Sequence, residues 1–436
     1  MRPTGQGEMM FALALGVLLA GAAMAGSPSP DDRTNAGYPS DPFAVAAEQQ
    51  MPLVPPGAEN PGPTDPRQGF SGTPVPAPGP SMAWGGAPSC SAPGPGYDGY
   101  SCPPIWYFGA GAHILGRTRA DKMSLTRDGL SSATVMTTRS ESFDGAPGGY
   151  AVLGRYLGLD SSNRNHFLEF DFWTENQWET DHAANSVGQV NYGTSADPVI
   201  AGSLTSFFPQ TLSGFTGSDT QQYDYDSRLL NFELNYWIRP RGRPDRLVLY
   251  PNGKWYRERN EDLISSFMFG VRGMTLDEDF TFTGESHVTT NAGTTDGFGK
   301  YRIDTQNDLV GIQIGADVIQ HGRRWEWGFQ AKAAPMVNFA EQNSHLLAEG
   351  NPSFVNTERR WEGSEGKIAF LGEVGMRGKY WLTPAAAVSA AYNAYWLTGV
   401  AMAPEQLTFA TFPTGQVNDE HLVFMHGLSL GLELNY

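Results

Sequence analysis

Cysteine is almost absent from this chain of 436 residues, which contains only Cys90 and Cys102. Both lie in a stretch rich in proline and glycine, with no histidine near them. A zinc site built from several cysteine and histidine ligands is therefore not expected. In an oxidising compartment the two residues would form a disulfide that closes a small loop, and the alternative is two free thiols in a flexible segment.

Positive charge is also scarce, with 29 Lys and Arg against 46 Asp and Glu and a net charge of −17. Contacts to phosphate groups need a basic surface, so this balance argues against nucleic acid as a partner. The 52 Gly, 24 Phe, 17 Tyr and 11 Trp instead indicate a protein rich in β-strands and turns, with many aromatic anchors.

Long apolar runs are missing after the first 25 residues. Residues 1–25 read as a signal peptide, since Arg2 precedes an apolar core and Ala23-Met24-Ala25 forms a small-residue cleavage site. We expect cleavage after Ala25 and export from the cytoplasm. Because no later stretch reaches the roughly 18 apolar residues of a spanning helix, a membrane location would require a β-barrel.

Residues 26–104 are dense in Pro, Gly, Ser and Ala and show no sustained apolar period. Such a segment buries too little surface to offset its ordering entropy, so it is predicted to be a disordered tether. The folded domain is expected at 105–436.

Within that domain, apolar residues alternate with small or polar ones in runs of about ten residues, the length of a tilted transmembrane strand. In LLNFELNYWI, residues 229–238, Leu230 and Phe232 share one face and Asn231 and Glu233 the other. About ten such runs predict an all-β, antiparallel transmembrane barrel. A twelve-stranded barrel stays open because residues 239–262 do not fit the pattern, and a soluble β-sandwich is not excluded by alternation alone.

The connections between the runs alternate in length. Long polar connections are predicted at 118–147, 174–225, 286–299, 339–364 and 397–419, whereas LDSSNRN, HGR and LTPAA are short. Long loops at one end and tight turns at the other are typical of bacterial outer-membrane barrels.

The chain ends in GLSLGLELNY, in which every second residue from Leu428 onward is large and apolar. The pattern of Ser429, Gly431, Leu434 and the terminal Tyr436 resembles the C-terminal signal of outer-membrane barrels. The resemblance implies that the barrel insertion machinery recognises the last strand, which pairs with the first and so removes both sheet edges.

Several longer stretches resemble β-barrel porin family number seven, found in planctomycete-type bacteria. They are GVRGMTLDEDFTF, NDLVGIQIGADV, FLGEVGMRGKYWLTP and AYNAYWLTGVAMAPEQL, and the resemblance spans roughly 105–436. The G-x-R-x-x-x-L-x-E and A-P-E-Q motifs are its most specific parts. The resemblance implies an outer-membrane barrel and supplies no catalytic residues.

The alternation also predicts which polar side chains face the lumen. Ten strands leave an interior that side chains nearly fill, so a wide pore is not expected. Both signs of charge occur, and the residues either satisfy one another as a plug or line a narrow path for small solutes. The predicted set is Arg155, Glu169, Asp171, Asn231, Glu233, Asn235, Arg272, Gln313, Asp317, Glu326, Lys332, Glu373, Arg377, Lys379 and Glu433.

Signals for catalysis or metal binding are weak. Residues 427–431 fit the nucleophile pattern G-x-S-x-G, but only five residues follow, which leaves no place for a later acid and histidine. The eight histidines show no ligand spacing. Asp277-Glu278-Asp279 reads as an acidic rim. No enzyme activity, metal or cofactor is expected.

Two classes of function follow. The first is an envelope structural protein or narrow porin-like channel, with outer-membrane lipid and small solutes as partners. The second is a surface-recognition scaffold that binds through loops 118–147 and 174–225. A barrel enzyme is a third and weaker hypothesis.

Overall fold

The computed structural model describes residues 104–193, 199–242, 246–249, 251, 253, 255–258, 261–322, 324–383, 385–410 and 415–436. The expected signal peptide, the tether up to residue 103 and both cysteines lie outside the described residues. The chain divides into two units, Met1–Gly85 and Gly86–Tyr436, and the structure below belongs to the second.

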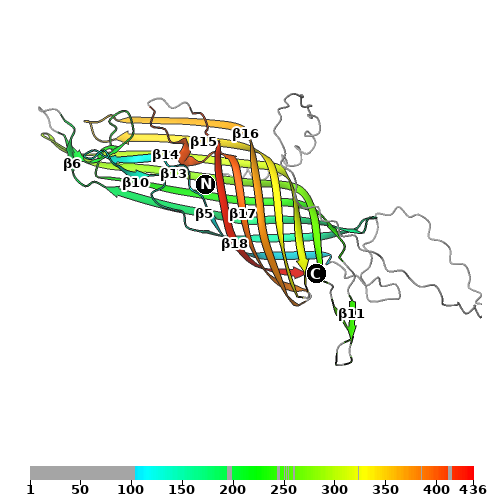
Figure 1. The fold of residues 1–436 in the computed structure, drawn as a ribbon. Helices are drawn as coiled ribbons and strands as arrows, with labels where there is room; N and C mark the ends of the chain where they lie inside the picture. Colours follow the sequence, from blue (N-terminus) through cyan, green and yellow to red (C-terminus); the bar gives the residue numbers. More distant parts are fainter. Residues whose placement is uncertain are drawn as a thin grey trace, which may run out of the picture. The chain divides into compact units, whose positions relative to one another are not determined.

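Ten antiparallel strands form a closed ring in the order β1-β18-β17-β16-β15-β14-β13-β10-β5-β4, with β4 returning to β1 (Figure 1). The prediction of a ten-stranded antiparallel barrel is thus confirmed, and the twelve-stranded alternative is wrong. The strands are β1 (Trp106–Arg117), β4 (Ala146–Leu159), β5 (Arg164–Asn185), β10 (Thr220–Pro240), β13 (Asp262–Thr290), β14 (Gly293–His321), β15 (Trp325–Glu349), β16 (Thr357–Thr383), β17 (Ala386–Val400) and β18 (His421–Asn435).

The last strand closes the ring against the first, as its sequence predicts. The backbone N–H of Tyr436 donates to Trp106 O at 2.8 Å, and Trp106 N donates to Tyr436 O at 3.0 Å. The register runs from Tyr107 opposite Asn435 to Arg117 opposite Met425. The chain therefore stays hydrogen-bonded in the sheet to its final residue.

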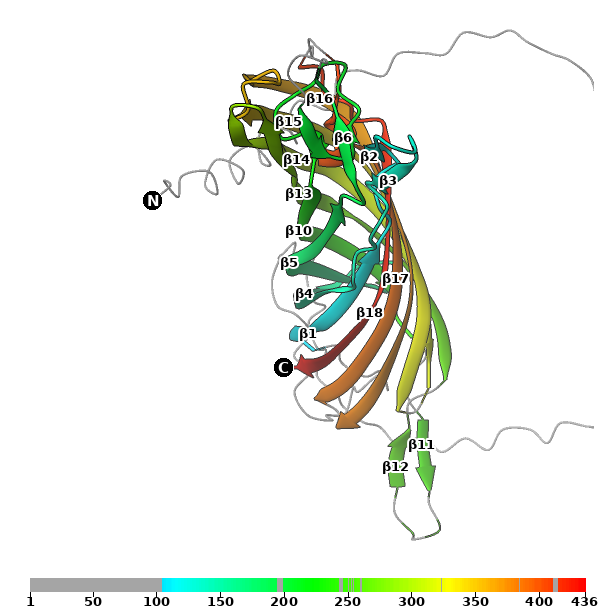
Figure 2. The ribbon, with the colours of Figure 1, turned by 90° about the vertical axis from the view of Figure 1, so that its left-hand side faces the viewer.

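The segment 239–262 that broke the alternation contains a separate hairpin. Its strands β11 (Arg246–Leu249) and β12 (Trp255–Glu258) pair with each other and not with the ring (Figure 2). This hairpin lies at the end of the barrel where both β1 begins and β18 ends. We call that end the turn end, because β4–β5, β14–β15 and β16–β17 are connected there by short turns.

At the opposite end, which we call the loop end, several predicted loops are in fact strands. Residues 286–299 continue β13 and β14, which join through only two residues, and 174–185 and 220–225 belong to β5 and β10. The prediction failed because the outward side chains there are polar, which is the pattern of a strand in water rather than in lipid.

The outer surface changes from apolar to polar along the strands. Toward the turn end, outward side chains are apolar and exposed, such as Ile368 at 82 %, Leu432 at 60 % and Phe329 at 52 %. Toward the loop end, outward positions carry charges such as Asp279 and Arg302. An apolar band around a closed ring is the lipid-facing surface of a transmembrane barrel, which excludes the β-sandwich alternative.

Shorter elements occupy the mouth of the barrel at the loop end. β2 (Ser124–Asp128), β3 (Thr134–Thr137), β8 (Leu204–Ser206) and β9 (Thr216–Ser218) form a four-stranded sheet, and β6 (Gln189–Asn191) and β7 (Ile200–Gly202) attach to β13. The 3-10 helix η1 (Ala403–Gln406) lies between β17 and β18. Among the described residues, no helix is long and apolar enough to cross a membrane.

Candidate functional site in the barrel lumen

Arg272 on β13 lies at the centre of a charged network inside the barrel. Its Nη1 is 2.8 Å from Glu373 Oε2 and 3.2 Å from Glu233 Oε1, and its Nε donates to Asn231 Oδ1 at 2.7 Å. Lys332 Nζ is 2.9 Å from Glu233 Oε2 and 3.7 Å from Glu373 Oε1. Two cations face two carboxylates, and none of the four side chains is more than 9 % exposed. Because the charges balance, each buried ion has a partner.

Amide side chains supply the hydrogen bonds that the ion pairs leave open. Gln313 Nε2 donates to Glu233 Oε2 at 2.9 Å, Asn235 Nδ2 donates to the same oxygen at 3.0 Å, and Gln330 Nε2 donates to Glu373 Oε1 at 3.0 Å. These residues come from β14, β10 and β15. The network thus links strands across the lumen, which fixes the positions of its carboxylates.

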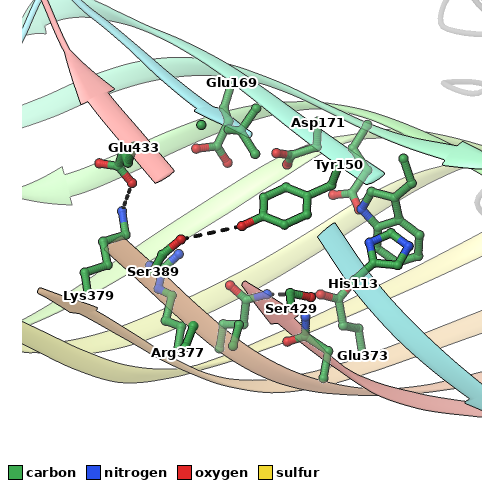
Figure 3. Close-up of a pocket in the computed structure, with 18 of the residues that line it drawn as sticks. His113, Tyr150, Glu169, Asp171, Glu373, Arg377, Lys379, Ser389, Ser429 and Glu433 are labelled. Carbon is green, nitrogen blue, oxygen red and sulfur yellow. Dashed lines mark hydrogen bonds and ion pairs between the residues drawn. The ribbon is translucent and has the colours of Figure 1, made fainter. Parts of the chain in front are cut away.

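A second set of charges lies nearer the turn end. Asp317 pairs with Arg377, Lys379 pairs with Glu433 (Figure 3), and Glu326 accepts a hydrogen bond from Trp381 Nε1 at 3.0 Å. The side chains of Arg377 and Lys379 are each 25 % exposed, so this set is wetter than the network around Arg272.

Two further predicted acids are held by neighbouring donors. Glu169 accepts hydrogen bonds from Tyr107 Oη at 2.5 Å and from Trp237 Nε1 at 2.8 Å. Asp171 Oδ2 accepts one from Asn235 Nδ2 at 3.1 Å.

On the loop-end side of the network, the lumen holds mainly apolar side chains, with the buried amides of Asn176, Asn307 and Asn338 among them. Every strand of the ring contributes at least one to a single cluster, which we call the apolar septum. Each member is at most 3 % exposed. The septum consists of Leu115, Ala120, Ala146, Trp178, Leu229, Met274, Leu276, Leu309, Ala334, Met336, Ala369, Leu371, Tyr395, Leu397, Val400, Met402, Val423 and Met425.

Beyond the septum, a buried ion pair ties the mouth segments to the wall. Arg117 Nη1 on β1 is 2.8 Å from Glu278 Oε1 on β13, and both side chains are fully buried. Glu278 Oε2 accepts hydrogen bonds from Tyr225 Oη at 2.8 Å and from the backbone N–H of Ala403 at 2.9 Å. Glu278 therefore does not lie on an acidic rim with Asp277, because its parity in the strand turns it inward.

A cavity of about 190 Å³ lies between the network and the turn end. Septum residues Leu115 and Tyr395 form part of its wall. The polar residues that line it include Tyr107, His113, Tyr150, Glu169, Asp171, Glu373, Arg377, Lys379, Ser389, Ser429 and Glu433 (Figure 3). The site can hold water or a small polar solute, and it offers both signs of charge.

All but one of the predicted lumen residues lie inside the barrel. The exception is Arg155, which is exposed on the outer surface with its Cζ 5.2 Å from the centre of the Trp106 ring. Leu153 and Leu157 face outward with it, whereas Tyr150 and Val152 line the cavity. The prediction failed because both faces of β4 carry apolar residues, so the alternation did not define its inward face.

The four residues of the C-terminal pattern divide between the two faces of β18. Ser429 points into the cavity, whereas Leu434 and Tyr436 are 53 % and 95 % exposed on the outside. Gly431 is on the inner face, where a Cβ would lie 2.1 Å from Tyr150 Oη. Glycine is needed at this position for packing, independently of any recognition by the insertion machinery.

The septum was missed by the reading of the sequence. In the sequence, a septum residue is an apolar residue at an inward position, such as Leu229 two residues before Asn231 or Leu371 two residues before Glu373. Within one strand, such a residue only interrupts the row of polar inward side chains. Only the register between strands brings them to one level.

No protein-family model and no curated protein matches this sequence. Among solved structures, the chain is similar to the outer-membrane protease OmpT of Escherichia coli, with 12 % identity, a TM-score of 0.32, and coverage of 76 % of this chain and 96 % of that one. It is also similar to a FadL homologue of Pseudomonas aeruginosa (7 % identity, TM-score 0.22, 77 % and 90 % covered) and to the toluene transporter TodX of P. putida (11 % identity, TM-score 0.16, 77 % and 91 % covered). Similarities at these TM-scores carry no inference about function. The class of protein rests on the closed ring and its apolar band, which are those of an outer-membrane β-barrel.

Proposed function

We propose that this protein is a structural barrel of the bacterial outer membrane whose lumen is closed. The observation that carries the proposal is the apolar septum, to which all ten strands contribute. An ion that crossed it would lose its hydration and meet few polar partners, because the amides at this level, Asn176, Asn307 and Asn338, are already hydrogen-bonded within the protein. The loss of hydration is a large energetic barrier. The charged network alone would not close the lumen as firmly, because polar groups can exchange their partners with a passing ion.

The proposal includes a route to the membrane and a set of partners. Residues 1–25 would direct export, the insertion machinery would read the strand that ends at Tyr436, and outer-membrane lipid would cover the apolar band. Membership of β-barrel porin family number seven is part of the same proposal, on the strength of the motifs around Arg272 and in A-P-E-Q. Nucleic acid is not proposed as a partner.

Single-channel recording tests the closed lumen. The full chain would be purified from outer-membrane fractions, checked for heat-modifiable migration, and inserted into planar lipid bilayers. We expect no discrete conductance steps. Steady steps in the unmodified protein would contradict the proposal and favour a narrow channel for small solutes.

Two variants locate the barrier. Replacement of Met336, Leu371 and Leu397 by serine should introduce leak currents, because it makes one side of the septum polar over three adjacent strands. The pair Glu233→Gln and Lys332→Met should stay silent, because it changes the network and leaves the septum intact. The opposite result would place the barrier in the charged network.

Surface recognition is the second candidate, and one observation favours it. Leu130 and Val187 are 58 % and 82 % exposed at the loop end, and a Cβ on Gly188 would lie 2.9 Å from Leu130 Cδ1, so the two segments adjoin. Deletion of most of 174–225 is not a usable test, because it would remove wall strands and the buried Phe215. Cells that display Leu130→Asp/Val187→Asp should instead adhere less to surface polysaccharide than cells with the unmodified barrel. Equal adhesion would count against recognition at this patch.

We also propose that the protein is not an enzyme. Ser429 of the G-x-S-x-G match lies within the straight strand β18, without the sharp turn and helix that an activated serine needs. His113 lies opposite Ser429 in the register, but its Nε2 contacts Asn176 Oδ1 at 2.7 Å. Ester or peptide hydrolysis that is lost in Ser429→Ala would overturn this proposal.

A further inference from the structure

Three metal-ligating side chains meet at the loop end, outside the lumen site. Asp121 follows β1, Glu405 is in η1, and His421 is the first residue of β18. One ligand atom from each lies within 4.8 Å of the ligand atoms of the other two. Asp121 lies 284 positions from Glu405 in the sequence, which explains why no ligand spacing indicates the group.

The carboxylate of Glu405 joins the other two residues. Its Oε1 accepts a hydrogen bond from the backbone N–H of Asp121 at 2.7 Å, and its Oε2 is 2.5 Å from His421 Nε2. The side chains of Glu405 and His421 are 6 % and 16 % exposed. Both groups are therefore held in place and largely shielded from water.

His421 Nε2 is buried and its partner is Glu405 Oε2, although the pair lacks the alignment of a good hydrogen bond. A hydrogen bond weakens when its atoms are poorly aligned. A cation between the nitrogen and the oxygen would satisfy both atoms, after a small separation of the two side chains.

Asp121 gives the group access to solvent, because its side chain is 80 % exposed. Its Oδ1 is 3.1 Å from Arg139 Nη2, which leaves Oδ2 as the ligand atom. Asp419, close to His421 in the sequence, is paired with Lys367. Arg139 therefore offsets the charge of Asp121, and Glu405 supplies the second negative charge of the group.

We propose that Asp121, Glu405 and His421 form a binding site for a divalent transition-metal ion of the zinc type. One imidazole and two carboxylates are ligands that zinc accepts, and three protein ligands leave a coordination position for water. A bound ion would connect the segment after β1, the η1 segment and the start of β18. It would thereby fasten η1 over the mouth of the barrel. The proposal does not depend on whether the lumen conducts.

The test is isothermal titration calorimetry, in which ZnCl₂ is added to the full, folded barrel in detergent. The background is Cys90→Ser/Cys102→Ser, which removes the thiols as competing ligands. We expect one zinc ion per chain, and a loss of affinity of about tenfold or more in Glu405→Gln and in His421→Ala. Glu405→Gln keeps the oxygen that accepts from Asp121 N–H, and heat-modifiable migration would verify that each variant folds.

Asp121→Asn is the variant least able to disturb folding, since its side chain is exposed and its backbone hydrogen bond remains. It should also weaken zinc binding. The matched control is His345→Ala, because His345 Nε2 lies 3.0 Å from Glu358 Oε1 in a similar pair elsewhere on the loop end. Co²⁺ in place of zinc should give a visible absorption spectrum that His421→Ala abolishes. Unchanged affinity in both Glu405→Gln and His421→Ala, or an equal loss in His345→Ala, would overturn the proposal.

Discussion

The two halves of the lumen are filled by different chemistry. The half toward the turn end holds several paired charges, amides and a cavity of about 190 Å³, whereas the half toward the loop end is packed mainly with apolar side chains and holds the buried pair Arg117–Glu278. Paired buried charges need fixed geometry and leave space between them, while apolar side chains can pack to the density of a protein core. The interior of one barrel can therefore be polar with a cavity at one level, as in a pore, and packed with apolar side chains at the next, as in the core of a soluble protein. The closure that we propose lies at the apolar level.

The largest expected loss of stability comes from removing the central cation of the charged network. Arg272→Leu would leave Glu233 and Glu373 buried without their central cation, and should lower the free energy of unfolding by about 3–5 kcal/mol. Urea unfolding of the folded barrel in lipid vesicles would measure it. Arg302→Leu is the control, because it removes an exposed ion pair worth at most about 1 kcal/mol. Equal losses in the two variants would mean that the network contributes no more than a surface pair.

The next effect tests the septum as a packed core. Leu397→Ala leaves a hole among fully buried neighbours and should cost about 2–5 kcal/mol. Leu430→Ala removes a similar side chain from the lipid-facing surface, where Leu430 is 55 % exposed and lipid can fill the space. The same urea assay should therefore show a smaller loss for Leu430→Ala. A larger loss at Leu430 would show that the septum is loosely packed.

A smaller effect is expected at the cavity wall. Gly431→Ala should cost about 1–3 kcal/mol, because the new Cβ would lie 2.1 Å from Tyr150 Oη and 2.7 Å from Ala110 O. Adding Tyr150→Phe removes the hydroxyl and should recover part of that loss in unfolding experiments. No recovery would assign the cost to the backbone contact at Ala110.

The smallest effect concerns the turn between β4 and β5, outside both halves of the lumen. The backbone N–H of Arg164, with its guanidinium and His166, lowers the pKa of the Asp160 carboxyl to about 2. A lowered pKa stabilises the fold above the unfolded value of about 4, and this contribution is lost as the pH falls through about 2. Asp160→Asn should thus unfold more easily than the unmodified barrel at pH 6, and the difference should disappear near pH 2. A difference that is independent of pH would assign the effect to the turn geometry alone.

Much of the barrel could be predicted from alternation, and the failures have identifiable causes. Leu230, Phe232 and Leu234 face lipid as expected, while Glu233 lies in the network. Arg155 was misplaced because β4 has apolar residues on both faces. The strand extensions of β13 and β14 were taken for loops because their outer faces are polar. In each case the side chains alternate between two faces as expected for a strand. The outer face, however, was not the more apolar of the two, so polarity did not show which face points inward.

From the sequence alone follow about ten antiparallel strands, with twelve left open, the pairing of the last strand with the first and most of the lumen-facing charges. These features depend on the alternation within single strands and on connections that are short compared with the strands. The tertiary structure was needed to reveal the apolar septum and the meeting of Asp121, Glu405 and His421 at the loop end. Both depend on the register between strands and on mouth segments that fold back onto the wall. Such contacts join residues hundreds of positions apart, and no local pattern in the sequence records them.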